Sequence, residues 1–162
     1  KHARTQGVPF LGICMGMQCA VIEYARNVLN MNEAHSTEHV PDSPHPVVTH
    51  MPETSLDVKG GTMRLGKSQF DVATGTLASK IYGADIVTIR HRHRYEVNPA
   101  YVDRLEAAGL RFSGRAGARM EAAEIADHPC FFALQGHPEF SSRPLRPCPA
   151  FIHFLQASVK GR

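Results

Sequence analysis

The sequence predicts an α/β domain, with an open, mostly parallel sheet that carries helices on both faces. Its 162 residues are enough for one domain, since single domains commonly run about 100 to 150 residues. An apolar run at residues 8–14 is too short for a helix and has no polar face, which is typical of a strand buried within a parallel sheet. A helical pattern follows it directly, and strand and helix patterns alternate again near the other end of the chain.

The composition excludes several kinds of protein. Hydrophobic residues make up 43% and charged residues 20% of the chain, as in an ordinary folded domain. No apolar run approaches the roughly 20 residues that span a bilayer, and no secretory signal is present, so we expect a cytoplasmic protein without a membrane partner. The net charge of +3 arises from scattered Lys and Arg, apart from Arg90, Arg92 and Arg94, and indicates no nucleic-acid partner.

The first part of the chain should alternate helix and strand. Residues 1–7 resemble the end of a helix that leads into the strand at 8–14. Residues 30–61 are polar and interrupted by prolines, so we expect a long surface loop in which only residues 46–51 form a strand. Between these segments, apolar residues at helical spacing predict a helix of about three turns: Met17, Ala20, Val21, Tyr24, Ala25 and Val28.

Short elements follow the loop. Residues 60–65 and 68–73 are expected to form strands, and residues 86–97 should be extended. Thr76 is a suitable N-cap for a brief helix, and Gly83 lies where that helix would end.

The last third should contain two helices that flank a group of strands. Asn98 can cap free amides while Pro99 occupies the first turn, so a helix should run over residues 99–108 and stop at Gly109. The expected strands are residues 110–113, 120–125 and 130–134. The inward-facing side chains of a closing helix at 149–159 should be Phe151, Phe154, Leu155 and Val159.

Residues 12–16, Gly-Ile-Cys-Met-Gly, have the form of a nucleophile elbow, in which glycines allow a sharp strand-to-helix turn. The helix N-terminus should favour the Cys14 thiolate, and the amide of Met15 could bind a developing oxyanion. A buried structural cysteine is the alternative that this motif alone leaves open. We assign that structural role to the other cysteines, which form no CxxC pair: Cys19, Cys130 and Cys148.

A base for this nucleophile is available in His137-Pro138-Glu139. Proline favours extended backbone at His137, and side chains at i and i+2 of an extended chain leave on the same side. Glu139 could therefore hold one ring nitrogen of His137, so that the other nitrogen faces the sulfur. A surface histidine beside a proline is the alternative for this motif on its own.

Together, residues 12–18 (GICMGMQ) and residues 135–139 (QGHPE) resemble the two signatures of class I, triad-type glutamine amidotransferases. The resemblance implies a flavodoxin-like fold and a catalytic triad of Cys14, His137 and Glu139. It also implies hydrolysis of the glutamine side-chain amide through a cysteinyl thioester, with ammonia passed to a partner domain.

Three further stretches, residues 32–40, 60–66 and 90–98, resemble one branch of this family over nearly the whole chain. In that branch the partner is a synthase domain of the same polypeptide, which uses ATP and Mg²⁺ to aminate UTP, and the full-length enzyme is a homo-oligomer. The amidotransferase domain itself needs no cofactor.

The resemblance also implies how L-glutamine would be bound. Glu38 and Arg94 would contact the ammonium and carboxylate of the substrate, while Met15 and Gln18 would line the pocket beside the thiol. Charge-assisted hydrogen bonds from such a pair suit a zwitterionic ligand. Without the resemblance, Glu38 would be read as a solvated loop residue.

The histidines near the arginine cluster suggest a metal site as one interpretation. Strand alternation should place Arg90, Arg92 and Arg94 on one side and His91, His93 and Tyr95 on the other. Because no third ligand stands at a telling distance, we expect no metal site. The stripe should instead line the interface with the synthase domain, as the resemblance implies.

Two departures from the family pattern bear on activity. An aromatic residue usually precedes the catalytic histidine, whereas Gly136 stands here, which should leave the wall beside His137 emptier and its backbone freer. Residues 1–162 should also be an amidotransferase domain without its earlier part, which in the family carries a glycine-rich oxyanion loop. The synthase domain should lie outside this chain.

Other functions stay open on the sequence alone. Another triad amidotransferase, such as that of GMP synthesis, or a γ-glutamyl hydrolase would share the two signatures, although the stretch at 60–66 favours neither. A non-catalytic regulatory domain is the alternative that Gly136 motivates.

Overall fold

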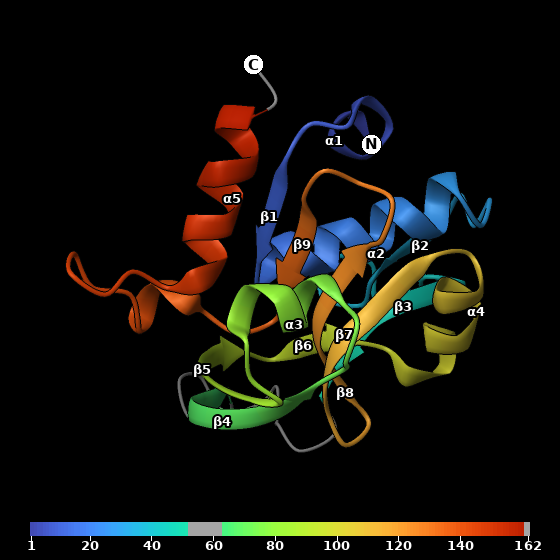
Figure 1. Cartoon of the computed structure of the whole chain (residues 1–162). Coiled ribbons are helices and arrows are strands. Elements are labelled where there is room, and N and C mark those ends of the chain that lie inside the picture. The colour runs from blue at the N-terminus through green and yellow to red at the C-terminus, as the bar shows by residue number, and fades with distance from the viewer. Residues whose placement is uncertain (52–62, 161–162) are drawn as a thin grey trace.

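The computed structural model describes residues 1–51 and 63–160 of the chain. Its first part alternates short helices and strands (Figure 1). The elements are α1 (His2–Gln6), β1 (Phe10–Ile13), α2 (Met15–Asn27), β2 (Ala34–Ser36) and β3 (His45–His50). The helix, strand and helix expected before residue 30 are therefore confirmed, whereas the three-residue strand β2 was missed because it is too short to show a pattern.

The second part supplies most of the sheet. Its first elements are β4 (Arg64–Val72), α3 (Leu77–Tyr82), β5 (Ile86–His93), β6 (Tyr95–Val97), the 3-10 helix η1 (Pro99–Tyr101) and α4 (Val102–Ala107). They are followed by β7 (Leu110–Ala116), β8 (Arg119–Ile125), β9 (Phe131–Leu134), the 3-10 helix η2 (Pro138–Phe140) and α5 (Pro149–Lys160).

The main sheet has six strands in the order β1-β9-β8-β7-β4-β5, and a smaller sheet has the order β2-β3-β6. In the main sheet β1 and β9 are parallel, while the pairs β9–β8, β8–β7, β7–β4 and β4–β5 are antiparallel. The expectation of a mostly parallel sheet is therefore wrong. A tight turn at Gly117, with φ 60°, joins β7 directly to β8, and such short connections give antiparallel strands, whereas parallel strands need long crossovers.

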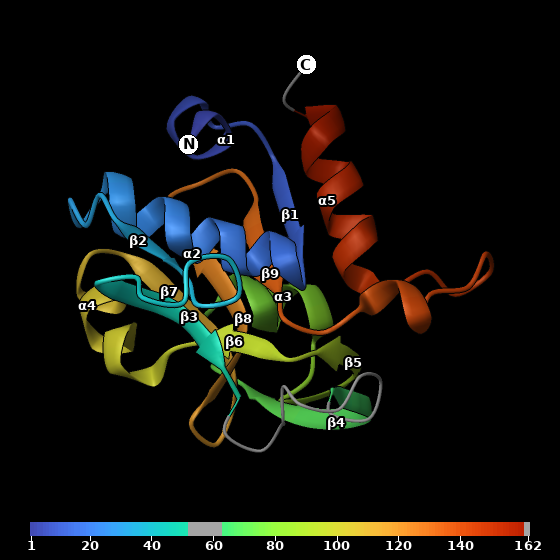
Figure 2. The same cartoon turned by 180° about the vertical axis from the view of Figure 1, so that it is seen from behind.

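Helices do cover both faces of the sheet, as expected. Figure 1 shows α3 in front of the sheet and α5 beside β1, and Figure 2 shows α2 in front of the sheet from the opposite side. One buried cluster packs α2 and α4 onto the sheet and includes Met17, Val21, Leu105 and Phe112. The other packs α3 and α5 onto the opposite face and includes Phe70, Ala78, Phe132 and Ala150.

Local capping signals were informative. Thr76 caps α3 through a capping box, and Gly83 ends this helix in the left-handed conformation. The Asn98 side chain accepts a hydrogen bond from the Ala100 amide, although the first turn after it is the 3-10 helix η1. Arg94 interrupts the extended chain expected over 86–97 and separates β5 from β6.

Two expectations need correction. The two strands expected at 60–65 and 68–73 are one strand, β4, within the described residues; residues 60–62 lie outside them, as do residues 52–59 of the expected loop. In α5, Leu155 and Val159 are 61% and 72% exposed rather than inward, because the helix packs through Ala150, Phe154 and Ala157. No helix in the described part of the chain is both long and apolar enough to cross a membrane.

Candidate active site

Cys14 lies at the sharp junction of β1 and α2. Its backbone has φ 50° and ψ −103°, a conformation that is rare for a residue with a side chain. The Cys14 amide donates to the Leu134 carbonyl at 2.8 Å, and the Cys14 carbonyl accepts from the amides of Met17 and Gln18, so the strand ends and the helix begins at this residue. The nucleophile elbow predicted from the sequence is thus formed.

The two glycines of the elbow differ in their steric role. A Cβ atom added at Gly12 would lie 2.9 Å from the carbonyl carbon of Gly16 and 3.0 Å from the Ala133 Cβ, so no side chain fits there. A Cβ atom added at Gly16 would meet nothing within 4 Å. Of these two glycines, only Gly12 therefore needs to be glycine to avoid a clash with the described residues.

The electrostatic setting of Cys14 is mixed. Burial raises the pKa of the Cys14 thiol, and the charges of Glu139 and Glu38 raise this pKa further. The backbone amide of Met15 and the side-chain amide of Gln135 donate to the sulfur and lower the pKa. On balance the pKa of Cys14 is raised, with burial as the largest cause, although the first amide of the helix acts to lower it.

His137 and Glu139 form the pair that the sequence predicted. His137 Nδ1 lies 2.6 Å from Glu139 Oε1, and because an ionised carboxylate only accepts, the proton belongs on Nδ1 and the lone pair on Nε2. His137 Nε2 is buried and has no hydrogen-bond partner among the described residues. His137 itself is extended, but Glu139 lies in η2, so the pair meets across a 3-10 turn rather than along an extended chain.

The imidazole is held on several sides. The His137 amide donates to the Arg90 carbonyl at 2.7 Å, and the Phe140 ring stacks on the imidazole with centroids 4.9 Å apart. The side chain of His137 is only 17% exposed. Phe140 thus provides an aromatic neighbour of the kind that the family pattern places at position 136.

Gly136 does not leave an empty wall, contrary to expectation. A Cβ atom added at Gly136 would lie 2.7 Å from Ile89 Cγ2 and 2.8 Å from Ile89 Cγ1. The Ile89 side chain already fills this space from β5. The residue that explains Gly136 lies far away in sequence, so the motif alone could not reveal it.

A cavity of about 140 Å³ joins Cys14 to the residues expected to bind glutamine. Its lining includes all four of them, Met15, Gln18, Glu38 and Arg94, which come from α2, the loop after β2 and the β5–β6 junction. Arg94 Nε is buried without a hydrogen-bond partner in the described structure, and Glu38 is exposed. One acidic and one basic side chain therefore line the same cavity as the thiol.

The cavity lining also contains residues that were not selected from the sequence. They are Met63, Arg92, His93 and Tyr95. Gln135, which contacts the sulfur, was identified in the sequence only as part of a signature.

The histidines of β5 point into the protein, and Arg90 and Arg92 point outward, as alternation predicted. His91 Nδ1 lies 3.1 Å from His93 Nε2, and His91 Nε2 lies 3.5 Å from Glu121 Oε2. Burial, and after it the charge of Arg64, lowers the pKa of His91 to about 3 and that of His93 to about 4. Both imidazoles are therefore buried, while Arg90 and Arg92 of the same strand reach the surface. No metal-binding group of three or more His, Cys, Asp or Glu side chains occurs among the described residues.

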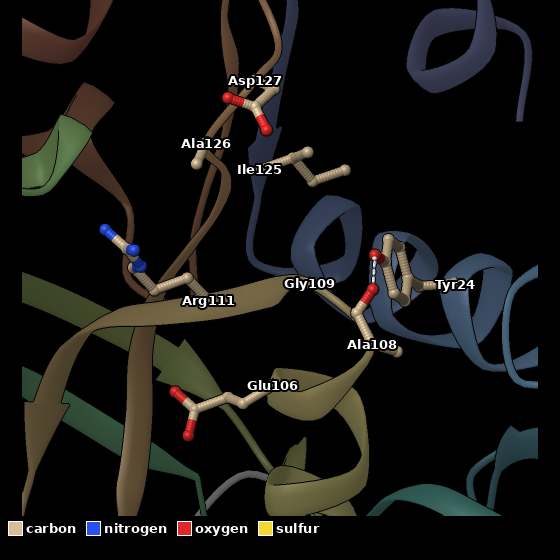
Figure 3. A pocket seen from close by; sticks show the side chains of 8 residues that line it. All are labelled: Tyr24, Glu106, Ala108, Gly109, Arg111, Ile125, Ala126 and Asp127. Atoms are coloured by element: carbon tan, nitrogen blue, oxygen red, sulfur yellow. Dashed lines mark hydrogen bonds between the residues drawn. The ribbon is translucent and has the colours of Figure 1, made fainter.

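Figure 3 shows another concavity, of about 520 Å³, around Gly109 and the end of β8. Its eight lining residues contain no cysteine or histidine. Tyr24 Oη donates to the Ala108 carbonyl at 2.7 Å, and Glu106 is bound by Arg115 and by the Phe112 amide. This concavity therefore lacks the groups for acyl transfer.

The sharp strand-to-helix turn at Cys14, the His137–Glu139 pair and a cavity lined by acidic and basic side chains occur together on this α/β fold. The chain belongs to the glutamine amidotransferase class-I family, whose model matches residues 1–157. CTP synthase of Archaeoglobus fulgidus is 54% identical to it over 165 residues, which cover 100% of this chain and 31% of that protein. CTP synthase of Thermus thermophilus is 52% identical over 168 residues, covering 98% of this chain and 30% of that protein.

Solved structures agree with this assignment. The glutaminase domain of Trypanosoma brucei CTPS with bound acivicin is 40% identical and superimposes with a TM-score of 0.90, over 98% of this chain and 62% of that chain. A glutamine amidotransferase of Thermotoga maritima shares the fold, with a TM-score of 0.51 at 12% identity over 85% of this chain and 44% of that chain. The chain spans about a third of the length of these curated CTP synthases, namely 31% of the Archaeoglobus fulgidus protein and 30% of the Thermus thermophilus protein.

Proposed function

We propose that this chain is the glutamine-hydrolysing part of a CTP synthase, with Cys14 as nucleophile and His137 and Glu139 as its base and orienter. One observation carries the proposal: a single cavity holds the Cys14 thiol together with Glu38 and Arg94. A free amino acid presents an ammonium and a carboxylate, so an acidic and a basic side chain in the lining of the cavity suit glutamine.

Met15 and Gln18 complete the glutamine site in this proposal. Both residues lie in the first turn of α2, directly after the nucleophile, and line the cavity beside its sulfur. Arg94 has a buried Nε without a partner in the described structure, and a substrate carboxylate would satisfy this donor. Glu38 would receive the substrate ammonium at the exposed side of the cavity.

The proposed reaction proceeds in two acyl-transfer steps. The Cys14 sulfur attacks the side-chain amide carbon while His137 Nε2 takes the thiol proton, and the same proton then goes to the departing nitrogen as ammonia leaves. Water next attacks the thioester carbon with His137 as base, which releases glutamate and restores the thiol. Glu139 keeps Nδ1 protonated and stabilises the imidazolium formed in each step.

The ammonia would be used by a synthase domain of the same polypeptide to aminate UTP. In this proposal the ATP, Mg²⁺ and UTP sites belong to the part of the full-length protein that this chain does not span, and the assembled enzyme is a homo-oligomer. The exposed Arg90 and Arg92 of β5, with Phe140 beside them, would face that synthase domain. Support comes from the high identity to curated CTP synthases.

The amidotransferase domain would also include residues that precede this chain. β1 is an edge strand of the main sheet although all its residues are apolar, and Phe10, Leu11 and Ile13 are only partly buried. Edge strands of this kind are normally paired or covered. We propose that an earlier segment covers β1 and supplies further oxyanion donors beside Cys14.

The proposal is tested by replacing Cys14 with Ala in the full-length enzyme and measuring two activities on one preparation. Synthesis from glutamine should be abolished, because Cys14 is the one thiol among the residues that line the described cavity. Synthesis from added ammonia should continue, because the synthase chemistry does not use this sulfur. Cys14→Ser should behave in the same way, since a hydroxyl has a much higher pKa than a thiol.

Three outcomes would contradict the proposed function. If Cys14→Ala still supports synthesis from glutamine, Cys14 is not the nucleophile. If a glutamine-analogue electrophile labels the wild-type enzyme at Cys19, Cys130 or Cys148 but not at Cys14, as read by peptide mass, the site has been misplaced. An absence of all glutamine turnover in the wild-type enzyme would support a regulatory domain instead.

A further inference from the structure

One backbone carbonyl fixes the orientation of the side chains behind the nucleophile. The Tyr95 carbonyl lies 2.8 Å from Gln18 Nε2 and 3.0 Å from His93 Nδ1. A carbonyl oxygen only accepts hydrogen bonds, so the Gln18 amide nitrogen must face it and His93 must carry its proton on Nδ1. Neither group can be turned around without losing a buried hydrogen bond.

The orientation of Gln18 then determines that of Gln135. Gln18 Nε2 also lies 3.4 Å from Gln135 Oε1, so the oxygen of the Gln135 amide faces Gln18. The amide nitrogen of Gln135 is consequently directed at Cys14 Sγ, 3.7 Å away. Gln135 is fully buried and its backbone amide donates to the Glu121 carbonyl, so the side chain is held from a rigid strand end.

We propose that Gln135 is a further catalytic residue that donates a hydrogen bond to the Cys14 sulfur and stabilises its thiolate, with Gln18 as the positioning residue that fixes the Gln135 amide. This inference rests on the proposed function because it takes Cys14 as the nucleophile. Burial and two nearby carboxylates oppose ionisation of Cys14 by raising its pKa. A donor to an ionised acceptor forms a stronger hydrogen bond than a donor to a neutral one, so Gln135 acts on the thiolate more than on the thiol.

The test measures the thiol directly and needs no turnover. In the full-length enzyme, the rate at which iodoacetamide alkylates Cys14 is followed over a range of pH by peptide mass, for the wild type and for Gln135→Met. Methionine has a similar length but no donor. The pKa of Cys14 should rise by about one unit, which corresponds to about tenfold slower alkylation below that pKa. Gln156→Met, at an exposed position on α5, is the matched control and should leave the profile unchanged.

Gln135→Glu is a second variant, to be used if Gln135→Met does not fold. It keeps the length of the side chain and an oxygen towards Gln18, and it replaces the donor that faces the sulfur with a second carboxylate oxygen, whose negative charge also disfavours the thiolate. The Cys14 pKa should rise by at least as much as in Gln135→Met. An unchanged Cys14 pKa in either folded variant overturns the role of Gln135.

Gln18→Met tests the positioning step. If Gln18 orients Gln135, the pKa of Cys14 should rise in the substrate-free enzyme, by less than in Gln135→Met. If Gln18 only contacts glutamine, the substrate-free profile will not move, and the positioning role is wrong. These readouts are independent of the nucleophile test. If Cys14→Ala still uses glutamine, the proposed function is refuted. If the alkylation profile does not change in the Gln135 variants, only the assignment of Gln135 is refuted.

Discussion

The Ile89 side chain occupies the space that any side chain at Gly136 would need, with its Cγ2 only 2.7 Å from the position of an added Cβ. Gly136 precedes the proposed base, His137, so β5 and the loop that carries His137 pack closely against each other at this point. Substitutions at position 136 therefore report on how the base is held.

Gly136→Ala should destabilise the protein by about 1–3 kcal/mol, because the new methyl group must displace a buried isoleucine. Gly136→Phe should be worse and should lower glutaminase activity. The measurement is the free energy of unfolding in urea together with glutamine hydrolysis. Gly16→Ala is the matched control, because an added Cβ there meets nothing within 4 Å and should not destabilise the protein.

The same contact can be tested as a pair. Ile89→Ala should itself cost about 2–5 kcal/mol, since it deletes buried methyl groups. If Ile89 is the obstacle, the combination of Ile89→Ala with Gly136→Ala should be less destabilising than the sum of the single changes. A strictly additive result would show that the two side chains do not compete for this space.

Arg94→Ala in the full-length enzyme should weaken glutamine use while ammonia-driven synthesis survives. Loss of a charged pair with the substrate carboxylate should lower kcat/KM for glutamine by about tenfold or more. Arg111→Ala, an exposed change on β7, is the control and should have no effect on glutamine use. Equal kcat/KM values for the Arg94 and Arg111 variants would remove Arg94 from the glutamine site.

Acidification should destabilise the fold through the histidines of β5. The folded-state pKa values of His91 and His93 are lowered to about 3 and about 4 from 6.5, so the unfolded chain binds more protons between these values. Stability is therefore fully present above pH of about 6.5 and falls as the pH drops below it, by about 1 kcal/mol per pH unit for each histidine. Burial raises the pKa of Glu121. Protonation of this one carboxyl therefore favours the folded state as the pH falls, which opposes the effect of the histidines.

Urea unfolding at neutral pH and at about pH 5 measures this dependence. His93→Gln should make stability less sensitive to pH, whereas His39→Gln, at an exposed position, should leave the sensitivity as it is. Equal pH sensitivity in the wild type and the His93 variant would mean that His93 is not buried in its neutral form.

Residues 1–162 on their own should hydrolyse glutamine poorly even when folded. The proposed segment beside β1 would supply oxyanion donors, and loss of one such donor can cost about a hundredfold in kcat. The comparison is glutaminase turnover per mole for the chain and for the full-length enzyme. Comparable turnover would show that nothing outside this chain is needed for hydrolysis.

Local signals in the sequence predicted much of this architecture. The apolar run before Cys14, the helical spacing after it and the cap at Thr76 each depend on near neighbours, and each is confirmed. Strand direction was wrong, because the pairing of β8 with β7 and β9 is set by short turns rather than by the apolar pattern. The exposed Leu155 of α5 could not be anticipated, since helical spacing alone does not tell which apolar stripe meets the sheet.

In the candidate site, too, contacts between near neighbours were predicted and contacts between distant residues were not. The pairing of His137 with Glu139 depends on adjacent residues and was predicted, and the resemblance selected Glu38 and Arg94, which do line the cavity of Cys14. The contacts of Ile89 with Gly136 and of Gln135 with Cys14 join distant parts of the chain. Such pairs carry no local pattern, so only the folded arrangement could identify them.

The acceptor on which the amides behind Cys14 depend is the main-chain oxygen of Tyr95. Any amino acid at position 95 would offer the same oxygen, so substitutions there can preserve this anchor while changing the ring that packs against His50. A survey of side-chain replacements would therefore rank position 95 as tolerant in this respect. Replacing the peptide bond that follows Tyr95 by an ester, which weakens its carbonyl as an acceptor, would expose the dependence that such a survey overlooks.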